Sequence, residues 1–254
     1  MFHVAIPARH GSTRLPGKAL LPLAGKPMLR WVYERACASG ASRVVIATDH
    51  PAIVEAARAF GAEARLTSAA HPSGTDRIAE LAALERWAGS DIVVNVQGDE
   101  PLIPPGLIRQ AAEVLESSPR ADIATLATPI ASLDEFLDPN CVKVVAAAGG
   151  RALYFSRAPI PWWRDGAPAG VASQSRFALA RRHVGIYAYR VGALARLAAL
   201  APTGLEMAER LEQLRALEHG LTIQVDDARE LPGPDVNTAE DLERVAALMA
   251  GGAG

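Results

Sequence analysis

The stretch Asp91-Ile-Val-Val-Asn-Val-Gln-Gly-Asp-Glu100 decides the fold. From Asp91 to Val96 it is rich in β-branched residues, which is typical of a strand buried on both faces of a sheet. Gln97 to Glu100 follow at once, so polar side chains stand at the carboxyl end of this strand. Parallel sheets bind ligands at the carboxyl ends of their strands. The stretch therefore predicts a buried parallel sheet and also the edge at which its site lies.

The first half of the chain repeats a strand-helix alternation around this stretch. Further strands are predicted at 4–6, 43–48 and 64–66, and helices at 28–38, 53–60 and 75–87. Such βαβ rhythm predicts an α/β fold with a mostly parallel, Rossmann-like sheet covered by helices. The loop after Ile6, the turn at Asp49 and the residues after Val96 then share one crevice at the carboxyl edge.

The second half of the chain is organised differently. From about Ala121 it becomes strand-rich, with strands predicted at 123–128, 142–146, 152–155 and 183–189. We read this as a smaller α/β insertion: residues 1–120 and 205–250 form the core, and 121–204 a smaller subdomain. Within it, 165–175 is rich in Gly, Ala, Pro and Ser, which predicts a mobile loop that could be a lid or a linker.

The chain is predicted to end in three elements. They are an amphipathic helix over 205–219, a strand over 221–225, and a last helix that Thr238 can cap.

Composition narrows the function classes. The 254 residues carry a formal net charge of -2, which lacks the basic excess that nucleic-acid binding needs. Cys37 and Cys141 form no paired motif, and the six histidines show no metal-binding spacing. No apolar stretch reaches the length of a membrane span. These features predict a cytoplasmic protein that binds neither nucleic acid nor membrane.

The loop Ile6-Pro-Ala-Arg-His-Gly-Ser-Thr-Arg-Leu-Pro-Gly-Lys18 carries three cations and two glycines. It is not a P-loop, because five residues separate its glycines and Ala19 follows the lysine in place of a hydroxyl. Its glycines let backbone amides approach a ligand, and Arg9, Arg14 and Lys18 supply charge, which suits a triphosphate. A solvated basic turn is the alternative.

Two further segments point to the same crevice. Asp99, directly after the strongest strand, is placed to hold Mg²⁺ beside phosphates, although an aspartate after a strand is also common in ordinary turns. His71-Pro-Ser-Gly-Thr-Asp-Arg77 precedes a helix and could bind a nucleobase or an anion. Ser73 or Thr75 could equally be a plain N-cap.

Segments of the second half offer hydrogen-bond donors for a polyhydroxylated acid. Tyr154-Phe-Ser-Arg157 and Arg181-Arg-His-Val-Gly-Ile-Tyr187 place cations, a histidine and phenols on strand-like runs. An exposed strand face would look similar. Glu212 and Gln213 lie between leucines of a helical stripe, so the residues alone favour a solvated helix face for them.

Five of these stretches together resemble the 3-deoxy-manno-octulosonate (Kdo) cytidylyltransferase family. The motifs are 6–18, 71–77, Asn95-Val-Gln-Gly-Asp-Glu-Pro101, Ala152-Leu-Tyr-Phe-Ser-Arg157 and His183-Val-Gly-Ile-Tyr187. The resemblance runs from Val4 to about Met249. It implies a nucleotidyltransferase sheet, transfer of CMP from CTP to Kdo with release of pyrophosphate for lipopolysaccharide assembly, a Mg²⁺ requirement and a homodimer.

The resemblance also implies roles for individual residues. Arg9, Arg14, Lys18 and Asp99 would be catalytic, with Asp99 holding magnesium. The triphosphate and cytidine of CTP would be bound by Arg9, Ser12, Arg14, Lys18, Ser73, Gly74, Thr75 and Arg77. The sugar acid would be bound by Gln97, Arg157, His183, Tyr187, Glu212 and Gln213.

One position departs from the family pattern. Val236-Asn237-Thr238 stands where the family usually reads Val-Asp-Thr, so Asn237 offers the metal an amide oxygen in place of a carboxylate, unless Asp235 turns inward. Asn237 also favours the alternative of a catalytically silent nucleotide-binding regulator. A second alternative is an N-acylneuraminate cytidylyltransferase, which resembles this chain at the first loop.

Overall fold

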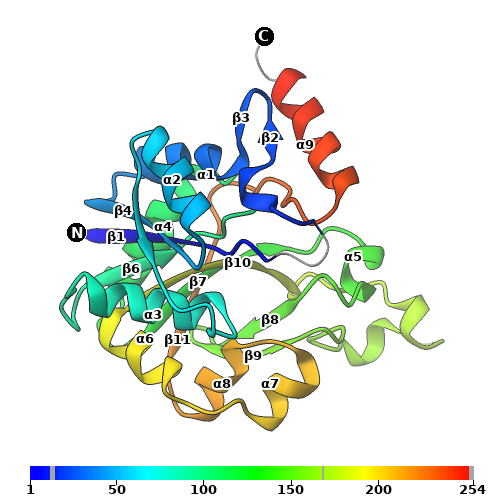
Figure 1. The fold of residues 1–254 in the computed structure, drawn as a ribbon. Coiled ribbons are helices and arrows are strands. Elements are labelled where there is room, and N and C mark those ends of the chain that lie inside the picture. Colours follow the sequence, from blue (N-terminus) through cyan, green and yellow to red (C-terminus); the bar gives the residue numbers. More distant parts are fainter. Residues whose placement is uncertain (12–14, 168, 252–254) are drawn as a thin grey trace.

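The computed structural model describes residues 1–11, 15–167 and 169–251. Within them, nine strands form one mixed sheet (Figure 1), in the order β11-β7-β10-β6-β1-β4-β5, with β8 paired to β10 and β9 paired to β8. The strands are β1 (Phe2–Ala8), β4 (Arg43–Thr48), β5 (Glu63–Leu66), β6 (Ile92–Asn95), β7 (Ile123–Pro129), β8 (Lys143–Ala146), β9 (Ala152–Ser156), β10 (Arg181–Arg190) and β11 (Ile223–Asp227). A separate hairpin joins β2 (Pro22–Leu23) and β3 (Lys26–Pro27).

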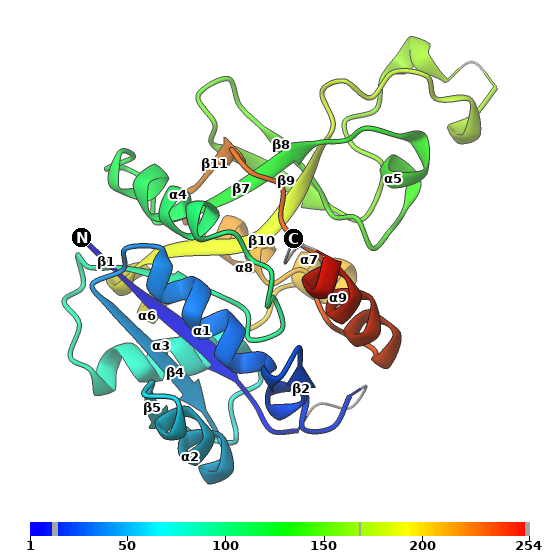
Figure 2. The ribbon, with the colours of Figure 1, turned by 90° about the horizontal axis from the view of Figure 1, so that it is seen from above.

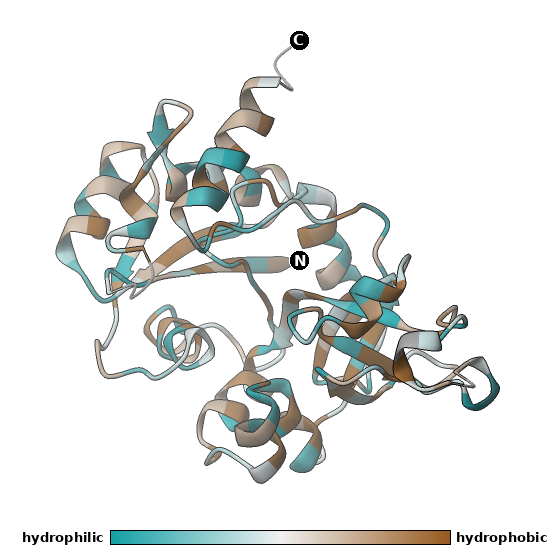
Figure 3. Ribbon diagram, turned by 90° about the vertical axis from the view of Figure 1, so that its right-hand side faces the viewer, coloured by the Kyte–Doolittle hydropathy of each residue, from teal (hydrophilic) through white to brown (hydrophobic). Residues whose placement is uncertain are grey.

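Helices cover both faces of this sheet. They are α1 (Met28–Ala38), α2 (Pro51–Ala59), α3 (Gly74–Leu84), α4 (Pro105–Glu116), α5 (Leu133–Leu137), α6 (Val191–Ala198), α7 (Gly204–Glu209), α8 (Gln213–Glu218) and α9 (Ala239–Gly251). Helices α1, α2 and α4 pack on one face, and α3, α6 and α8 on the other. Along the helices, hydrophobic and hydrophilic residues alternate (Figure 3), as expected for layers with one buried side. The predicted α/β class is confirmed.

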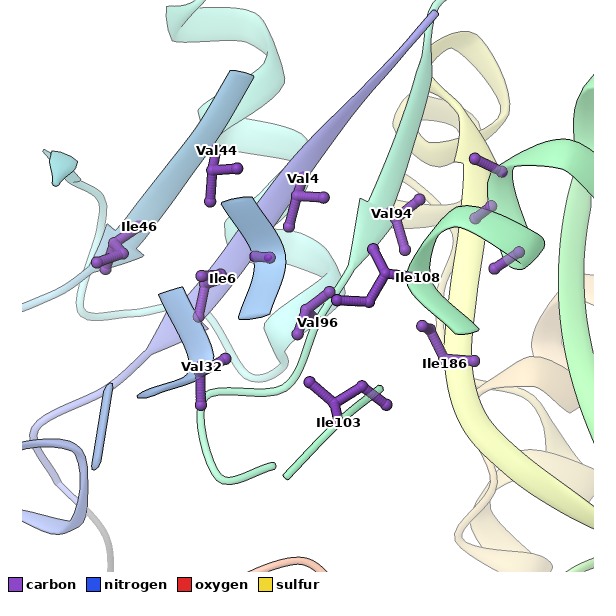
Figure 4. Packing of buried hydrophobic residues seen from close by; sticks show 14 of the residues in the cluster. Val4, Ile6, Val32, Val44, Ile46, Val94, Val96, Ile103, Ile108 and Ile186 are labelled. Atoms are coloured by element: carbon purple, nitrogen blue, oxygen red, sulfur yellow. The ribbon is translucent and has the colours of Figure 1, made fainter. Parts of the chain in front are cut away.

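Strand β1 is the centre of the parallel half. It pairs in parallel with β4 on one side and with β6 on the other, so that Val4 lies opposite both Val44 and Val94. These residues and Ile6 belong to one buried cluster (Figure 4). Because β1 and β6 run in the same direction, the loops after both strands emerge at the same edge of the sheet.

Strand β10 joins this half to the rest of the sheet. It is antiparallel to β6 on one side and to β7 on the other, and β11 pairs in parallel with β7. The predicted boundaries near residues 121 and 204 therefore do not coincide with a break in the sheet. A smaller subdomain over 121–204 stays a prediction.

One predicted helix is wrong. The segment expected as a single helix over 205–219 forms two short helices, α7 and α8, because Arg210 adopts a left-handed conformation with φ 54° and ends α7. Glu206 then pairs with Arg215, whose Nε lies 2.7 Å from its carboxylate, and this holds the two helices together. The break leaves Glu212 at the start of α8. The sequence analysis also predicted none of α4, α5 and α6.

The segment expected to be a lid or linker contains two short 3₁₀ turns, Arg164–Gly166 and Val171–Ser173. It belongs to an arm that projects from the body of the molecule between β9 and β10 (Figure 2). The last helix begins as predicted, since the amide of Asp241 donates to Thr238 Oγ1 at 3.2 Å.

The ends of β1 and β6 approach so closely at Gly98 that a side chain there should destabilise the protein. A Cβ added to Gly98 would lie 2.9 Å from the carbonyl oxygen of Pro7, a backbone atom that cannot move without shifting β1. Gly98→Ala is therefore expected to lower the free energy of unfolding by about 1–3 kcal/mol, measured by urea denaturation. Gly204→Ala, where the added Cβ meets nothing within 4 Å, is the control and should be close to neutral. Equal stability of the two variants would contradict this account.

Candidate functional site

A cavity of about 280 Å³ lies at the carboxyl edge of β1 and β6. Segments far apart in the sequence line it: residues 7–9, 18–19, 71–74 with Arg77, 97–99, and Asn237. The first loop and the residues after β6 meet here as expected, and the segment before α3 joins them. The turn at Asp49 does not line the cavity and reaches it only through the pair with Arg77. Ser12 and Arg14, two of the predicted CTP-binding residues, lie outside the residues that the structure describes.

Lys18 and Asp99 are brought together in this cavity. The Lys18 ammonium donates to Asp99 Oδ2 at 2.6 Å and to the carbonyl oxygen of Val236 at 3.0 Å. The amide of Val236 in turn donates to the carbonyl of Asp99 at 2.9 Å. Gly17, with φ 65°, makes the turn that presents Lys18. Lys18 therefore connects the first loop, the end of β6 and the segment before α9.

Arg77 differs from the other predicted CTP-binding residues because its side chain is buried and bonded to other protein groups. Its side chain is 4% exposed, and it donates to Asp49 Oδ2 at 3.1 Å and to Thr67 Oγ1 at 2.6 Å. The other oxygen of Asp49 accepts from the backbone amide of His10 at 2.9 Å. Arg77 lines the cavity, but its guanidinium is committed to Asp49 and Thr67, and through Asp49 it supports the loop after β1.

The residues at the start of α3 play two parts. Ser73 is the N-cap of this helix, since its Oγ accepts from the amide of Asp76 at 3.2 Å. Ser73 and Gly74 also line the cavity, so capping and ligand binding are compatible here. Thr75 points elsewhere, because its hydroxyl donates to the Glu212 carboxylate.

A second cavity of about 210 Å³ adjoins the first and shares Gly74 and Gln97 with it. Four of the predicted sugar-binding residues line it: Gln97, Tyr187, Glu212 and Gln213. The alternative of a solvated helix face for Glu212 is wrong, because the break between α7 and α8 places this residue at the cavity. The sequence reading missed Asn95 and Tyr189, which also line it. A signal for Asn95 was available, since it is the one polar residue within the run from Ile92 to Val96.

His183 and Arg157 do not line either cavity. His183 lies behind Tyr187, with 5.2 Å between the ring centroids, and its Nε2 is 2.9 Å from Thr125 Oγ1. Burial lowers the pKa of His183 to about 3, so the ring is neutral at pH 7. Arg157 donates from Nε to the carbonyl of Glu209 at 2.7 Å and from Nη1 to that of Pro139 at 2.8 Å. The sugar-binding roles of both residues stay predictions.

Comparisons with known proteins identify the family. A family model described as Cytidylyltransferase matches residues 4–223. A 3-deoxy-manno-octulosonate cytidylyltransferase of Thioalkalivibrio sulfidiphilus is 55% identical over 248 residues, and one of Pseudomonas fluorescens is 55% identical over 253, each comparison covering 98% of both chains. The chain belongs to the 3-deoxy-manno-octulosonate cytidylyltransferase family.

A solved structure agrees with this assignment. The structure of a CMP:2-keto-3-deoxy-manno-octonic acid synthetase complexed with CTP matches the cytidylyltransferase described here with a TM-score of 0.89. The two chains are 41% identical, and the match covers 99% of this chain and all of the other. In the described part of the chain, no helix has both the length and the apolar character to cross a membrane.

The oxygen ligands available to a metal in this cytidylyltransferase are few. Asp99 and Asn237 line the first cavity, and a carboxylate with an amide carbonyl is a donor set that suits Mg²⁺. No group of three or more His, Cys, Asp or Glu residues is placed to hold a metal within residues 1–11, 15–167 and 169–251. Magnesium often binds through one or two protein ligands plus substrate phosphates, so this set fits a metal that arrives with the nucleotide.

Carboxyl groups gather beside this donor set. Burial, together with the charges of Asp99 and Asp235, raises the pKa of Glu100 to about 8. Asp235 also accepts a hydrogen bond from Nδ2 of Asn237. The amide of Asn237 therefore connects the cavity to a carboxylate two residues away.

The buried ion pair of Arg77 and Asp49 should contribute to the stability of the fold even without substrate. Arg77→Met removes the cation and leaves a carboxylate that is only 16% exposed without its partner. We expect the free energy of unfolding to fall by about 2–4 kcal/mol in urea denaturation without CTP. Arg244→Met, which removes the exposed pair with Asp241, should cost under about 1 kcal/mol. A loss no larger for Arg77→Met than for Arg244→Met would show that the pair does not support the fold.

Proposed function

We propose that this cytidylyltransferase transfers CMP from CTP to Kdo and releases pyrophosphate, and that the product serves lipopolysaccharide assembly. The observation that carries the proposal is the pair of adjoining cavities. One is lined by Arg9, Lys18 and Asp99, and the other by neutral hydrogen-bonding groups with one carboxylate. Charged phosphates suit the first, and a polyhydroxylated sugar acid suits the second. The names of the relatives point to the same two substrates.

The reaction follows from this arrangement. The anomeric hydroxyl of Kdo forms a bond to the α-phosphorus of CTP, and the bond from that phosphorus to the bridging oxygen of pyrophosphate breaks, with the hydroxyl proton leaving to solvent. Arg9 and Lys18, together with Arg14, would bind the departing pyrophosphate and neutralise its charge. Gly74 and Gln97 line both cavities, so they lie where the two substrates meet. Positioning of the two substrates supplies much of the rate.

The cation beside Asp99 is part of the proposal. When bound, Mg²⁺ would neutralise charge on the phosphate oxygens, and Asp99 with Asn237 would hold it. In the structure the Lys18 ammonium lies at Asp99. Binding of the nucleotide would therefore draw Lys18 from the carboxylate toward the phosphates.

A homodimer and a cytoplasmic location also belong to the proposal. Strand β9 pairs only with β8 among the described strands. Leu153 on it is 50% exposed, and Trp162 and Leu179, on the arm that follows, are 46% and 64% exposed. Exposed apolar groups on β9 and on the arm that follows it support a contact with a second copy. The free cysteines Cys37 and Cys141 agree with a reducing compartment.

One assay separates this function from its alternatives. Pyrophosphate release from CTP and Mg²⁺ is measured with Kdo, with N-acetylneuraminate, and without a sugar acid. Release with Kdo alone supports the proposal, and release with N-acetylneuraminate alone supports the sialic acid alternative. CTP binding without release under any condition would support a silent regulator.

Asp99→Ala provides the sharpest test of the site. Because the carboxylate would hold the metal, we expect the turnover number to fall by about 10³-fold or more. The fold should persist in circular dichroism, although the pair with Lys18 is largely buried, with side chains 17% and 27% exposed, so its loss should lower the free energy of unfolding by about 1–3 kcal/mol. Glu113→Ala, which removes an exposed pair with Arg229 outside both cavities, is the matched control and should keep wild-type turnover. Near-normal turnover of Asp99→Ala would defeat the assignment.

Asn237→Asp tests the departure from the family pattern. If position 237 lies at the metal, an added carboxylate should reduce the Mg²⁺ concentration needed for half-maximal rate by roughly tenfold. Binding of Mn²⁺ to the protein with CTP, followed by electron paramagnetic resonance, should tighten in parallel. Asn140→Asp, on an exposed loop, adds the same charge elsewhere and should change neither quantity. An unchanged metal requirement in Asn237→Asp would place this residue outside the metal site.

A further inference from the structure

Asn95 occupies a position where the fold calls for an apolar side chain. It is the last residue of β6 and lies opposite Ala5 of β1 and Tyr187 of β10, in the middle of the sheet. Only 3% of the residue is exposed. Its neighbours Val94 and Val96 belong to the core on the other face of the sheet. Asparagine has a low strand propensity, so neither local preference nor burial explains this residue.

One atom of the Asn95 side chain also lacks a partner in the described part of the chain. Its Oδ1 is buried and has no hydrogen-bond partner among the described residues. Gln110, which is equally buried, shows the usual arrangement: Nε2 donates to the carbonyl of Asp227 at 2.7 Å, and Oε1 accepts from the amide of Arg229 at 3.0 Å. A buried polar atom without a partner lowers stability, and residues that break local rules in this way concentrate at functional sites.

The second cavity lies directly at this side chain. Asn95 lines it together with Gln97, Thr75, Tyr187 and Glu212. Among the described residues that line the cavity there is no arginine or lysine. The cavity therefore offers hydrogen bonds to neutral groups but no cation to a carboxylate, and it suits the hydroxyl-bearing part of a sugar acid.

We propose that Asn95 is a specificity-determining residue for the sugar acid, whose hydroxyl group completes the hydrogen bonding of this buried carboxamide. A hydroxyl can donate to Oδ1 and accept from Nδ2, whereas a carboxylate can only accept. Because strands on both sides hold β6, the amide is fixed in place before the substrate arrives, and a substrate without that hydroxyl leaves it unpaired. A site built in this way discriminates strongly against analogues lacking the group. The inference rests on the proposed function.

The test compares two buried amides replaced by the same apolar residue. Asn95→Leu is expected to raise the KM for Kdo at least about tenfold, while the KM for CTP stays within about twofold. Without substrate, its stability in urea should equal or exceed that of the wild type, since it removes an unpaired polar atom. Gln110→Leu should show the reverse, with lower stability and unchanged KM values. An unchanged KM for Kdo in Asn95→Leu would overturn the inference.

A set of Kdo analogues that each lack one hydroxyl sharpens the result. One analogue should lose rate with the wild type but not with Asn95→Leu, because the variant has already lost the partner of that hydroxyl. Equal losses for every analogue in both proteins would contradict the proposed contact. Should Asn95→Leu fail to fold, Asn95→Ser, which shortens the side chain and removes the amide, takes its place with the same expected rise in KM for Kdo. If the wild type itself releases no pyrophosphate with Kdo, the proposed function fails first, and the two outcomes remain distinct.

Discussion

The parallel pairing of β1 with β6 is the constraint on which the site depends. Both strands are buried between helical layers, and their valines interlock in one core. Their carboxyl ends therefore emerge side by side, with Gly98 against the carbonyl of Pro7. This approach brings the first loop, with Lys18, within hydrogen-bond distance of Asp99. The segment before α9 joins at the same point through Val236, so that the two ends of the chain meet at the cavity.

Buried polar groups in this fold divide into two kinds. Arg77 with Asp49, and Gln110 with its partners, are satisfied within the protein: Arg77 supports the loop after β1, and Gln110 holds the end of β11 to α4. Asn95 is equally buried, but its Oδ1 has no partner within residues 1–11, 15–167 and 169–251. Buried groups whose hydrogen bonds are satisfied help to fix one protein conformation. By contrast, the unpaired Oδ1 of Asn95 selects which substrate group can bind in the second cavity. The distinction depends on hydrogen bonds and could not be drawn from residue types alone.

The sequence was most informative where local rules act. Helix α1 lies at the predicted bounds, and Thr238 caps the last helix, because apolar periodicity and capping depend on near neighbours. The prediction failed between 205 and 219, where the leucine stripe continues through Arg210 although the backbone turns there. The turn is held by the pairing of Glu206 with Arg215 and by packing of α8 below the sheet, which are contacts that periodicity does not contain.

By itself the sequence determined the buried parallel strands, the edge that carries the site and the meeting of the first loop with the residues after β6, because strand direction places all strand ends of one kind together. Only the tertiary structure decided which polar residues line the two cavities. It committed the guanidinium of Arg77 to Asp49 and Arg157 to backbone carbonyls, turned Glu212 toward the second cavity, and left Oδ1 of Asn95, on the wall of that cavity, without a partner among the described residues. The physical reason is that hydrogen-bond satisfaction in a buried site depends on groups distant in sequence, and these come together only when the sheet and its two helical layers assemble.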